Sequence, residues 1–288
     1  MASTLSVAAL QYCAAGDAQT TLAHITPMIA YAAAKGARLV ALPEAATFIA
    51  PDRNALETQA EWEDQSTELA AFCTLAERHK LYLLVGSLFV RRRADNALVN
   101  RCYLIGPDGT TQASYDKIHM FDAAVGDGQT YRESDYFTAG TQAVMHPIDG
   151  IQCGLTICYD VRFPHLYRHL AQAGAQILTT PAAFTYNSGR AHWHILQRAR
   201  AIETGCYVIA PAQCGTHADG RRTYGHAMII SPWGEILAEA NTDDAAPKAG
   251  ANDAVIFAQI DPALPERVRR AIPSLANGRP FDECQTDA

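Results

Sequence analysis

The chain has 288 residues, of which 49% are hydrophobic and 18% charged, and its formal net charge is −7. This composition excludes a disordered or fibrous protein and fits one large α/β domain or two smaller ones. Mild acidity argues against nucleic-acid or membrane-surface binding, because both favour basic faces. No apolar run reaches the roughly 18 residues of a membrane span, and the first ten residues lack the pattern of a secretory leader.

Eight cysteines raise the question of disulfides or a metal site: Cys13, Cys73, Cys102, Cys153, Cys158, Cys206, Cys214 and Cys284. A chain of this length needs no disulfides, and without a leader we expect reduced thiols and a cytoplasmic protein. The Cys-x-x-Cys pairs typical of zinc sites are absent, so we expect no metal. Most of these cysteines should be small core residues, and the remaining question is whether one is reactive.

Short runs typical of β-strands alternate with segments of helical period. The predicted strands are Leu5–Gln11, Arg38–Leu42, Leu81–Phe89, Val99–Ile105, Gln152–Ile157, Gln176–Thr180, Cys206–Pro211, Ala227–Ser231 and Ala254–Ile260. The predicted helices contain residues 22–32 and 69–76 or span Pro164–Gly174 and Ala191–Thr204. On the last helix we expect an inward face made of Ile195, Leu196, Ala199 and Ile202.

Two parts of the chain repeat the same motifs. Residues 36–45 resemble residues 174–183, and two later segments, each ending in a Pro-x-Gly turn, match at one common offset. We therefore expect an α/β fold with two pseudo-equivalent halves whose sheets pack face to face, a four-layer α-β-β-α sandwich. Residues 1–262 should form a single domain with an exposed loop at Asn241–Asn252, and residues 263–288 a polar C-terminal tail.

Cys158 ends a predicted strand and is followed by a sharp turn and a helix. A nucleophile at such a turn is lifted clear of the sheet, and helix-terminal N–H groups would favour its thiolate. The alternative is that Cys158 is the last buried residue of its strand. A thiol-redox role lacks a resolving partner, because Cys153 lies at an odd offset on the same strand and faces the opposite side.

Histidine, the usual base for a cysteine nucleophile, has few suitable candidates. His192 and His194 are two residues apart, so they face different sides of a helix. His165 and His169 have the spacing of a metal-binding pair, but no acidic or thiol ligand lies nearby in the sequence. We expect these two on a solvated face.

A carboxylate and an ammonium offer a second route to the same chemistry. Glu44 ends an apolar strand, and Lys117 follows a Pro-Asp-Gly hairpin among apolar residues. A charge in such a setting needs a partner or a chemical task. Each residue alone also fits an ordinary strand-end charge, but together with Cys158 they form a recognisable set.

Four motifs carry a resemblance to a known family: Leu42-Pro-Glu44, Tyr115-Asp-Lys117-Ile-His-Met-Phe-Asp, Cys158-Tyr-Asp-Val-Arg-Phe-Pro and Arg198-Ala-Arg-Ala-Ile-Glu-Thr. With them the chain resembles the nitrilase (carbon–nitrogen hydrolase) superfamily and its Glu–Lys–Cys triad, from the first strand to about Asp261. Further segments resemble the deaminated glutathione amidase branch: Pro181-Ala-Ala-Phe-Thr, Ala191-His-Trp-His, Ala210-Pro-Ala-Gln-Cys-Gly215 and Tyr224-Gly-His-Ala-Met. The ω-amidase branch is a close rival.

The resemblance implies a role for each matching residue. Glu44 would be the general base, and Cys158 would attack the amide carbon to form a thioester. Lys117 and the backbone N–H of Tyr159 would hold the oxyanion, and Glu133 matches a second glutamate near the lysine. No metal or organic cofactor is implied, and the family's habit of pairing through the helices near the nucleophile implies a homodimer.

Substrate class follows partly from the resemblance and partly from one arginine. We expect a cysteine-dependent amidase for a small carboxylated amide, preferably deaminated glutathione, which yields 2-oxoglutarate and cysteinylglycine. Arg162 would bind the substrate carboxylate as a bidentate clamp, or alternatively pair with Asp160. The other possibilities are an ω-amidase acting on 2-oxoglutaramate or 2-oxosuccinamate, or a non-catalytic binding module on the same scaffold.

Two places depart from the family pattern. His165 follows Pro164 where many relatives have glutamate, which we interpret as a variation at the start of a helix. The segment Asp122–Gln129 is also atypical and lies where a substrate-facing loop is expected. Both leave the triad intact, and the second bears on fine specificity.

Overall fold

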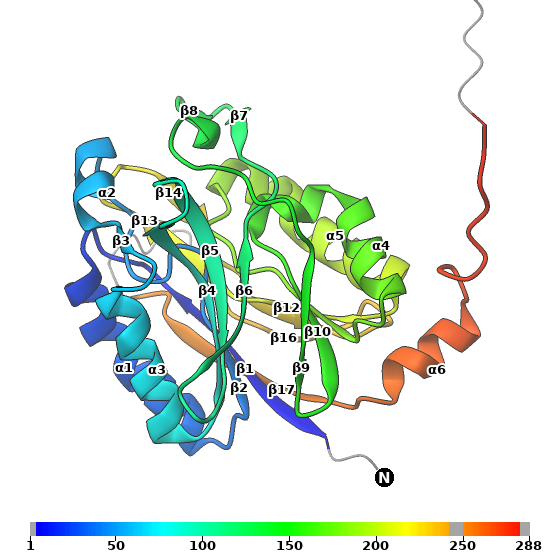
Figure 1. The fold of residues 1–288 in the computed structure, drawn as a ribbon. Coiled ribbons are helices and arrows are strands. Elements are labelled where there is room, and N and C mark those ends of the chain that lie inside the picture. Colours follow the sequence, from blue (N-terminus) through cyan, green and yellow to red (C-terminus); the bar gives the residue numbers. More distant parts are fainter. Residues whose placement is uncertain (1–3, 242–249, 283–288) are drawn as a thin grey trace, which may run out of the picture.

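The computed structural model describes residues 4–241 and 250–282 as two β-sheets lying between two layers of helices (Figure 1). Sheet one has nine strands: β1 (Leu5–Tyr12), β2 (Leu39–Ala41), β3 (Glu61–Trp62), β4 (Tyr82–Arg91), β5 (Leu98–Ile105), β6 (Thr111–Asp116), β13 (Ala212–Thr216), β14 (Arg222–Tyr224) and β17 (Ala254–Ile260). Sheet two has six: β9 (Val144–Ile148), β10 (Ile151–Leu155), β11 (Ile177–Thr179), β12 (Tyr207–Ala210), β15 (Met228–Ile230) and β16 (Ile236–Glu239). A separate hairpin joins β7 (Asp122–Ala124) to β8 (Thr130–Arg132).

The helices lie outside the two sheets: α1 (Ala18–Ala34), α2 (Arg53–Gln59), α3 (Thr67–His79), α4 (Pro164–Gln172), α5 (Tyr186–Thr204) and α6 (Leu264–Ala271). Helices α1 and α3 cover sheet one, while α4 and α5 cover sheet two (Figure 1). Three of the helix starts follow ordinary capping rules, because the side chains of Asp17, Asp52 and Ser66 accept backbone N–H groups of the first turns of α1, α2 and α3. Within the described residues no helix is long and apolar enough to cross a membrane.

Alternation along β1 explains the layering. Val7 and Ala9 belong to the cluster that includes the residues of sheet two, whereas Ala8 and Leu10 pack with α1 and α3. Because side chains alternate across a strand, one buried strand can supply both interfaces. The predicted four-layer α/β sandwich is therefore confirmed.

The two halves are built alike, as the repeated motifs predict. Sheet one contains the order β1-β2-β4-β5-β6, and sheet two contains β10-β11-β12-β15-β16. In both, the first three strands are parallel and the last two antiparallel. The motif 36–45 leads through β2, and the matching motif 174–183 leads through β11.

All nine predicted strands and all four predicted helices are present, but the inward face predicted for α5 is wrong at Ile195 and Ile202. Ile195 and Ile202 are 70% and 52% exposed, and the buried face instead includes Trp193, Gln197 and Arg200. The buried Arg200 is accommodated because its Nε donates to the Val161 carbonyl at 2.8 Å. Ile195 and Ile202 therefore point away from the core, whereas Leu196 packs against it.

Two predicted boundaries have mixed outcomes. Most of the predicted loop Asn241–Asn252 lies outside the described residues. The predicted tail from residue 263 begins with α6, in which Pro265 and Val268 are buried. From the same helix Arg269 donates to the carbonyls of Thr204 and Ala175, so α6 is attached to the second half.

Candidate active site

Glu44 is held in a tight turn three residues after the end of β2. The following residue, Ala45, has a left-handed φ of 53°, and its N–H donates to Ser87 Oγ at 2.9 Å. The amide Nε2 of buried Gln213 donates to the carbonyls of Glu44 and Ala45, both at 3.1 Å. These bonds fix the backbone at Glu44, and the carboxylate itself accepts the Ala183 N–H at 2.9 Å.

Gly86 allows this turn to approach β4. A Cβ at Gly86 would lie 2.1 Å from the Leu42 carbonyl oxygen and 2.4 Å from Pro181 Cβ. Real Cβ atoms do not approach so closely, so only glycine fits between the turn of Glu44 and the loop after β11. The latter loop also contacts Cys158, because Pro181 O accepts the Cys158 N–H at 2.9 Å.

Cys158 lies on a 3₁₀ turn, Cys158–Arg162, between β10 and α4, as predicted. Its φ of 45° is a left-handed conformation that non-glycine residues rarely adopt and that is often found at functional sites. Fully buried Asp160 stabilises the turn: its carboxylate accepts the Ile157 N–H at 2.8 Å and the Tyr115 hydroxyl at 2.7 Å. The strained turn is therefore fixed from behind.

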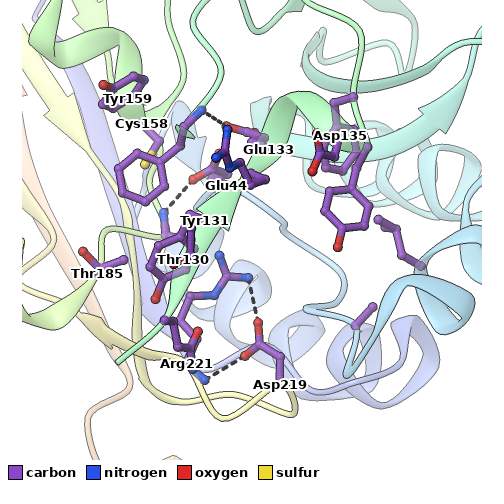
Figure 2. Close-up of a pocket in the computed structure, with 18 of the residues that line it drawn as sticks. Glu44, Thr130, Tyr131, Glu133, Asp135, Cys158, Tyr159, Thr185, Asp219 and Arg221 are labelled. Atoms are coloured by element: carbon purple, nitrogen blue, oxygen red, sulfur yellow. Dashed lines mark hydrogen bonds and ion pairs between the residues drawn. The ribbon is translucent and has the colours of Figure 1, made fainter. Parts of the chain in front are cut away.

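Lys117, directly after β6, lines the pocket and joins Glu44 and Glu133, which lie next to each other in Figure 2. Its Nζ lies 2.9 Å from Glu44 Oε1 and 2.8 Å from both carboxylate oxygens of Glu133. Asn100 Nδ2 donates to Glu44 at 3.0 Å and to Glu133 at 3.2 Å. The structure thus brings Glu44, Lys117, Glu133 and Cys158 to one pocket from distant parts of the chain.

The charges of this cluster are set by one another. Burial alone would raise the pKa of Glu44, but the Lys117 ammonium overrides it, and the net shift is downward. Burial would lower the pKa of Lys117, but Glu133 and Glu44 raise it well above its usual value. The ground state is therefore a carboxylate beside an ammonium.

The expectation that helix-terminal N–H groups favour a Cys158 thiolate is wrong. Burial, followed by the neighbouring Glu44 carboxylate, raises the pKa of Cys158 well above its usual value. The favourable effect of Lys117 is smaller than these two. The resting pair is a protonated thiol next to an ionised carboxylate, the arrangement in which the carboxylate can accept the thiol proton.

The cavity has a volume of about 420 Å³, and Glu44, Lys117, Glu133, Cys158 and Tyr159 line it. Within the described residues the backbone N–H of Tyr159 has no hydrogen-bond acceptor, so it is available to a ligand. The atypical segment Asp122–Gln129 forms β7 and the turn towards β8, and its last residue lines the same cavity.

Arg162 does not line the cavity. Its guanidinium lies 5.2 Å from the ring centroid of Phe184 and 6.0 Å from that of Tyr159, two residues that do. The pairing with Asp160 is not observed; among the described residues, Arg162 Nη2 is 3.3 Å from His192 Nδ1. Arg162 therefore lies behind the pocket wall.

Asn100 and Asp160 are site residues that the sequence analysis missed. Asn100, on β5, is buried and bonds both glutamates, and Asp160 also accepts from the His119 backbone N–H at 3.2 Å. In the sequence, Asn100 appears as a polar residue inside an apolar strand. Asp160 appears as an acidic residue two positions after the thiol. Neither pattern differs from that of an ordinary turn or strand residue.

Potential metal ligands meet outside the pocket. His194 Nε2 and His226 Nδ1 lie 2.8 and 2.7 Å from the same oxygen of Glu239. Hydrogen bonds between the rings and the carboxylate account for this arrangement without an ion. His165 and His169 are exposed on α4, as predicted for a solvated face.

All seven cysteines in the described part of the chain are unpaired, and Cys284 lies outside that part. Cys102, Cys153 and Cys206 are fully buried core residues. Cys153 belongs to the core cluster that contains both sheets, so it is a packing residue as predicted.

Comparison with known proteins finds a family model and relatives that match most of the chain. A family model described as carbon-nitrogen hydrolase matches residues 6–270. A deaminated glutathione amidase of Synechocystis is 42% identical over 93% of this chain and 96% of its own length. The mouse protein of that name is 37% identical over 95% of this chain and 83% of its own length. The crystal structure of the C. elegans NitFhit protein superposes with a TM-score of 0.86 at 34% identity, over 97% of this chain and 66% of the other.

Proposed function

The chain belongs to the carbon–nitrogen hydrolase family, and we propose that it is a cysteine-dependent amidase whose substrate is deaminated glutathione. The observation that carries the chemistry is the contact of Lys117 with Glu44 beside the protonated Cys158 thiol in one pocket. The substrate is supported by the names of relatives at 37–42% identity.

In the first half-reaction the Glu44 carboxylate takes the Cys158 proton while the sulfur forms a bond to the amide carbon. The Tyr159 N–H and the Lys117 ammonium stabilise the negative charge that develops on the amide oxygen. Because Lys117 already bonds three carboxylate oxygens, it shares one of its N–H groups with this oxyanion. Glu44 then gives its proton to the nitrogen, and the carbon–nitrogen bond breaks. The amine departs, and the acyl group remains bound to Cys158 as a thioester.

The second half-reaction uses the same groups with water as the nucleophile. Glu44 takes a proton from water as the oxygen bonds to the thioester carbon, and the carbon–sulfur bond breaks. The proton returns to the sulfur, and the acid product leaves. Glu133 is a positioning residue here, since it holds Lys117 and is itself fixed by the Phe121 N–H at 2.6 Å.

Intact-mass measurement after incubation with an amide tests this mechanism. We expect an acyl adduct on the wild type and none on Cys158→Ala, together with release of amine or ammonia by the wild type only. Cys73→Ala is a matched control, because this thiol is partly accessible but outside the pocket. The substrates to test are deaminated glutathione, 2-oxoglutaramate and 2-oxosuccinamate. If none of them gives an adduct or amine release, the binding-module alternative is favoured over the amidase. Faster turnover of the primary amides would favour the ω-amidase alternative.

We also infer a homodimer that pairs through α4 and α5. The exposed apolar residues Ile195 and Ile202 of α5 support it, together with Trp233, which is 53% exposed. A Cβ at Gly234 would contact the Ile202 side chain, so Ile202 lies against the turn that carries Trp233. In light scattering coupled to gel filtration, Ile195→Asp should give a monomer and Tyr31→Asp on α1 should not. A monomeric wild type would refute the inference.

A cytoplasmic location remains part of the proposal, supported by the unpaired thiols of the described residues. Catalysis through Glu44, Lys117 and Cys158 as written involves no metal or organic cofactor. Cell fractionation with a tagged full chain tests the location.

A further inference from the structure

The cavity extends away from the thiol to a wall that carries Arg221 and Asp219. Both residues line the same cavity as Cys158, and in Figure 2 they lie on the side away from Cys158 and Tyr159. Arg221 directly precedes β14 in sheet one, and its main chain pairs with His217. The residue is therefore presented to the cavity by the edge of a sheet.

The Arg221 guanidinium is held in place, but several of its N–H donors have no acceptor among the described residues. Its Nη2 lies 3.2 Å from Asp219 Oδ2, while Asp219 Oδ1 accepts the backbone N–H of Arg221 at 2.9 Å. The Tyr131 ring centroid lies 6.0 Å from the guanidinium. Within the described residues Asp219 is the only carboxylate paired with it, and the buried Nε has no acceptor. An arginine has five N–H donors, so most of them remain for a ligand.

The other cations at this cavity are differently engaged. Lys117 is buried between two glutamates, and Arg53 is exposed, pairs with Glu57 and lies over the Tyr136 ring. Arg132 is exposed. Arg221, with a side-chain exposure of 24%, is the partly desolvated cation of this cavity, and desolvation strengthens a charge-assisted hydrogen bond.

We propose that Arg221 binds a carboxylate on the amine side of the scissile amide, so that the pocket selects amides whose leaving group ends in a carboxylate. This inference rests on the proposed amidase function. Guanidinium groups bind carboxylates through paired N–H donors. In deaminated glutathione the leaving group is cysteinylglycine, whose terminal carboxylate is the ligand of this class. A primary amide, which releases only ammonia, has no leaving-group carboxylate for Arg221 to bind.

Asp219 acts as a positioning residue in this arrangement. It occupies one nitrogen of the guanidinium and bonds the backbone of the same residue. The side chain is thereby prevented from folding back towards solvent, and less conformational entropy is lost when the substrate binds.

The test combines enzyme variants with matched substrates. Arg221→Gln is compared with Arg222→Gln, which removes the same charge from the next residue, one that stacks on Tyr186 and does not line the cavity. The substrates are deaminated glutathione, its C-terminal carboxamide and 2-oxoglutaramate, which share one acyl group. Loss of a charged hydrogen bond weakens binding by about tenfold or more. We expect Arg221→Gln to lower kcat/KM for deaminated glutathione relative to 2-oxoglutaramate by at least that factor, mainly through KM, and Arg222→Gln to leave the ratio within about twofold.

The carboxamide separates binding from structure. If Arg221 binds the terminal carboxylate, wild type and Arg221→Gln should differ by less than about twofold on the carboxamide, and Arg221→Lys should recover part of the lost selectivity. Equal losses on acid and carboxamide, or an unchanged ratio, would overturn the inference and leave the amidase proposal standing. A wild type that turns over none of the three amides would refute the amidase proposal itself.

Discussion

Glu44 and Glu68 are both only 6% exposed, yet their carboxyl groups have opposite pKa shifts. Glu44 contacts Lys117, and its pKa is lowered. Among the described residues, the carboxyl of Glu68 on α3 accepts a hydrogen bond only from the Thr47 hydroxyl, at 2.5 Å, and burial raises its pKa to about 7. The Thr47 that bonds Glu68 lies three residues after Glu44, so the two environments adjoin. The comparison indicates that the buried cation, and not burial itself, keeps a carboxylate ionised for use as a base.

We expect the largest effect from removal of the Lys117 ammonium, which should abolish the difference in pKa between Glu44 and Glu68. In Lys117→Met, the Glu44 carboxyl should acquire the character of Glu68 and become neutral at higher pH, and the oxyanion should lose a donor. We expect kcat/KM to fall by at least roughly 10²–10³, and the acid limb of the residual activity to move upward in pH. Lys35→Met, an exposed lysine at the end of α1, is the control and should retain full activity. A Lys117→Met rate within tenfold of wild type contradicts the role assigned to this ammonium.

Neutralising Glu68 should have the next largest effect, on stability. Its folded pKa of about 7 exceeds the usual glutamate value of 4.5, so the neutral carboxyl stabilises the fold below pH 4.5, and this contribution is lost as pH rises through about 7. Glu68→Gln keeps an acceptor for Thr47 and avoids that loss. We expect it to raise the free energy of unfolding by up to about 3 kcal/mol at pH 8 and hardly at all at pH 4.5. Urea titrations at the two pH values measure this, and an equal or negative change at pH 8 would be incompatible with a buried ionised Glu68.

The pH profile of the wild type should show the smallest effect. Because the pKa of Glu44 is lowered, the base stays ionised down to below the usual glutamate pKa of 4.5. Stability from its contact with Lys117 is likewise present above pH 4.5 and lost as pH falls through the lowered value. We expect kcat/KM to stay level from pH 5 to 8 in samples that circular dichroism finds folded. An acid limb centred near pH 7 would mean that Glu44 behaves like Glu68.

Sequence reasoning succeeded where chemistry and periodicity coincide. Lys117 directly follows β6, and Glu44 and Cys158 come three residues after the ends of β2 and β10, so the topology brings the three side chains together. It failed at Asn100, because an asparagine within β5 has no local feature that distinguishes it from a surface residue. Its function follows only from the two carboxylates that the fold places next to it.

The inward face predicted for helix α5 was partly wrong, for a physical reason. A stripe of Ile195, Leu196, Ala199 and Ile202 indicates an apolar face, but a pattern cannot say whether that face meets the core or a partner. In the structure the core side of α5 is mixed, with Gln197 and Arg200 buried beside Trp193 and Ala201. Eight strands were not predicted, and four of them (β3, β7, β8 and β14) have only two or three residues, too few to carry a periodic signal.

The pairing of β1 with β17 has a consequence for the order in which the protein can be made. These strands join in antiparallel register from Leu5–Ile260 to Gln11–Ala254. During synthesis β1 therefore leaves the ribosome long before β17. The backbone groups of β1 that pair with β17 have no partner on that strand until β17 has emerged. Unpaired edges invite association with other chains. A ribosome that stalls before residue 254 releases a chain with an open edge on its first strand, a natural substrate for chaperones and proteases.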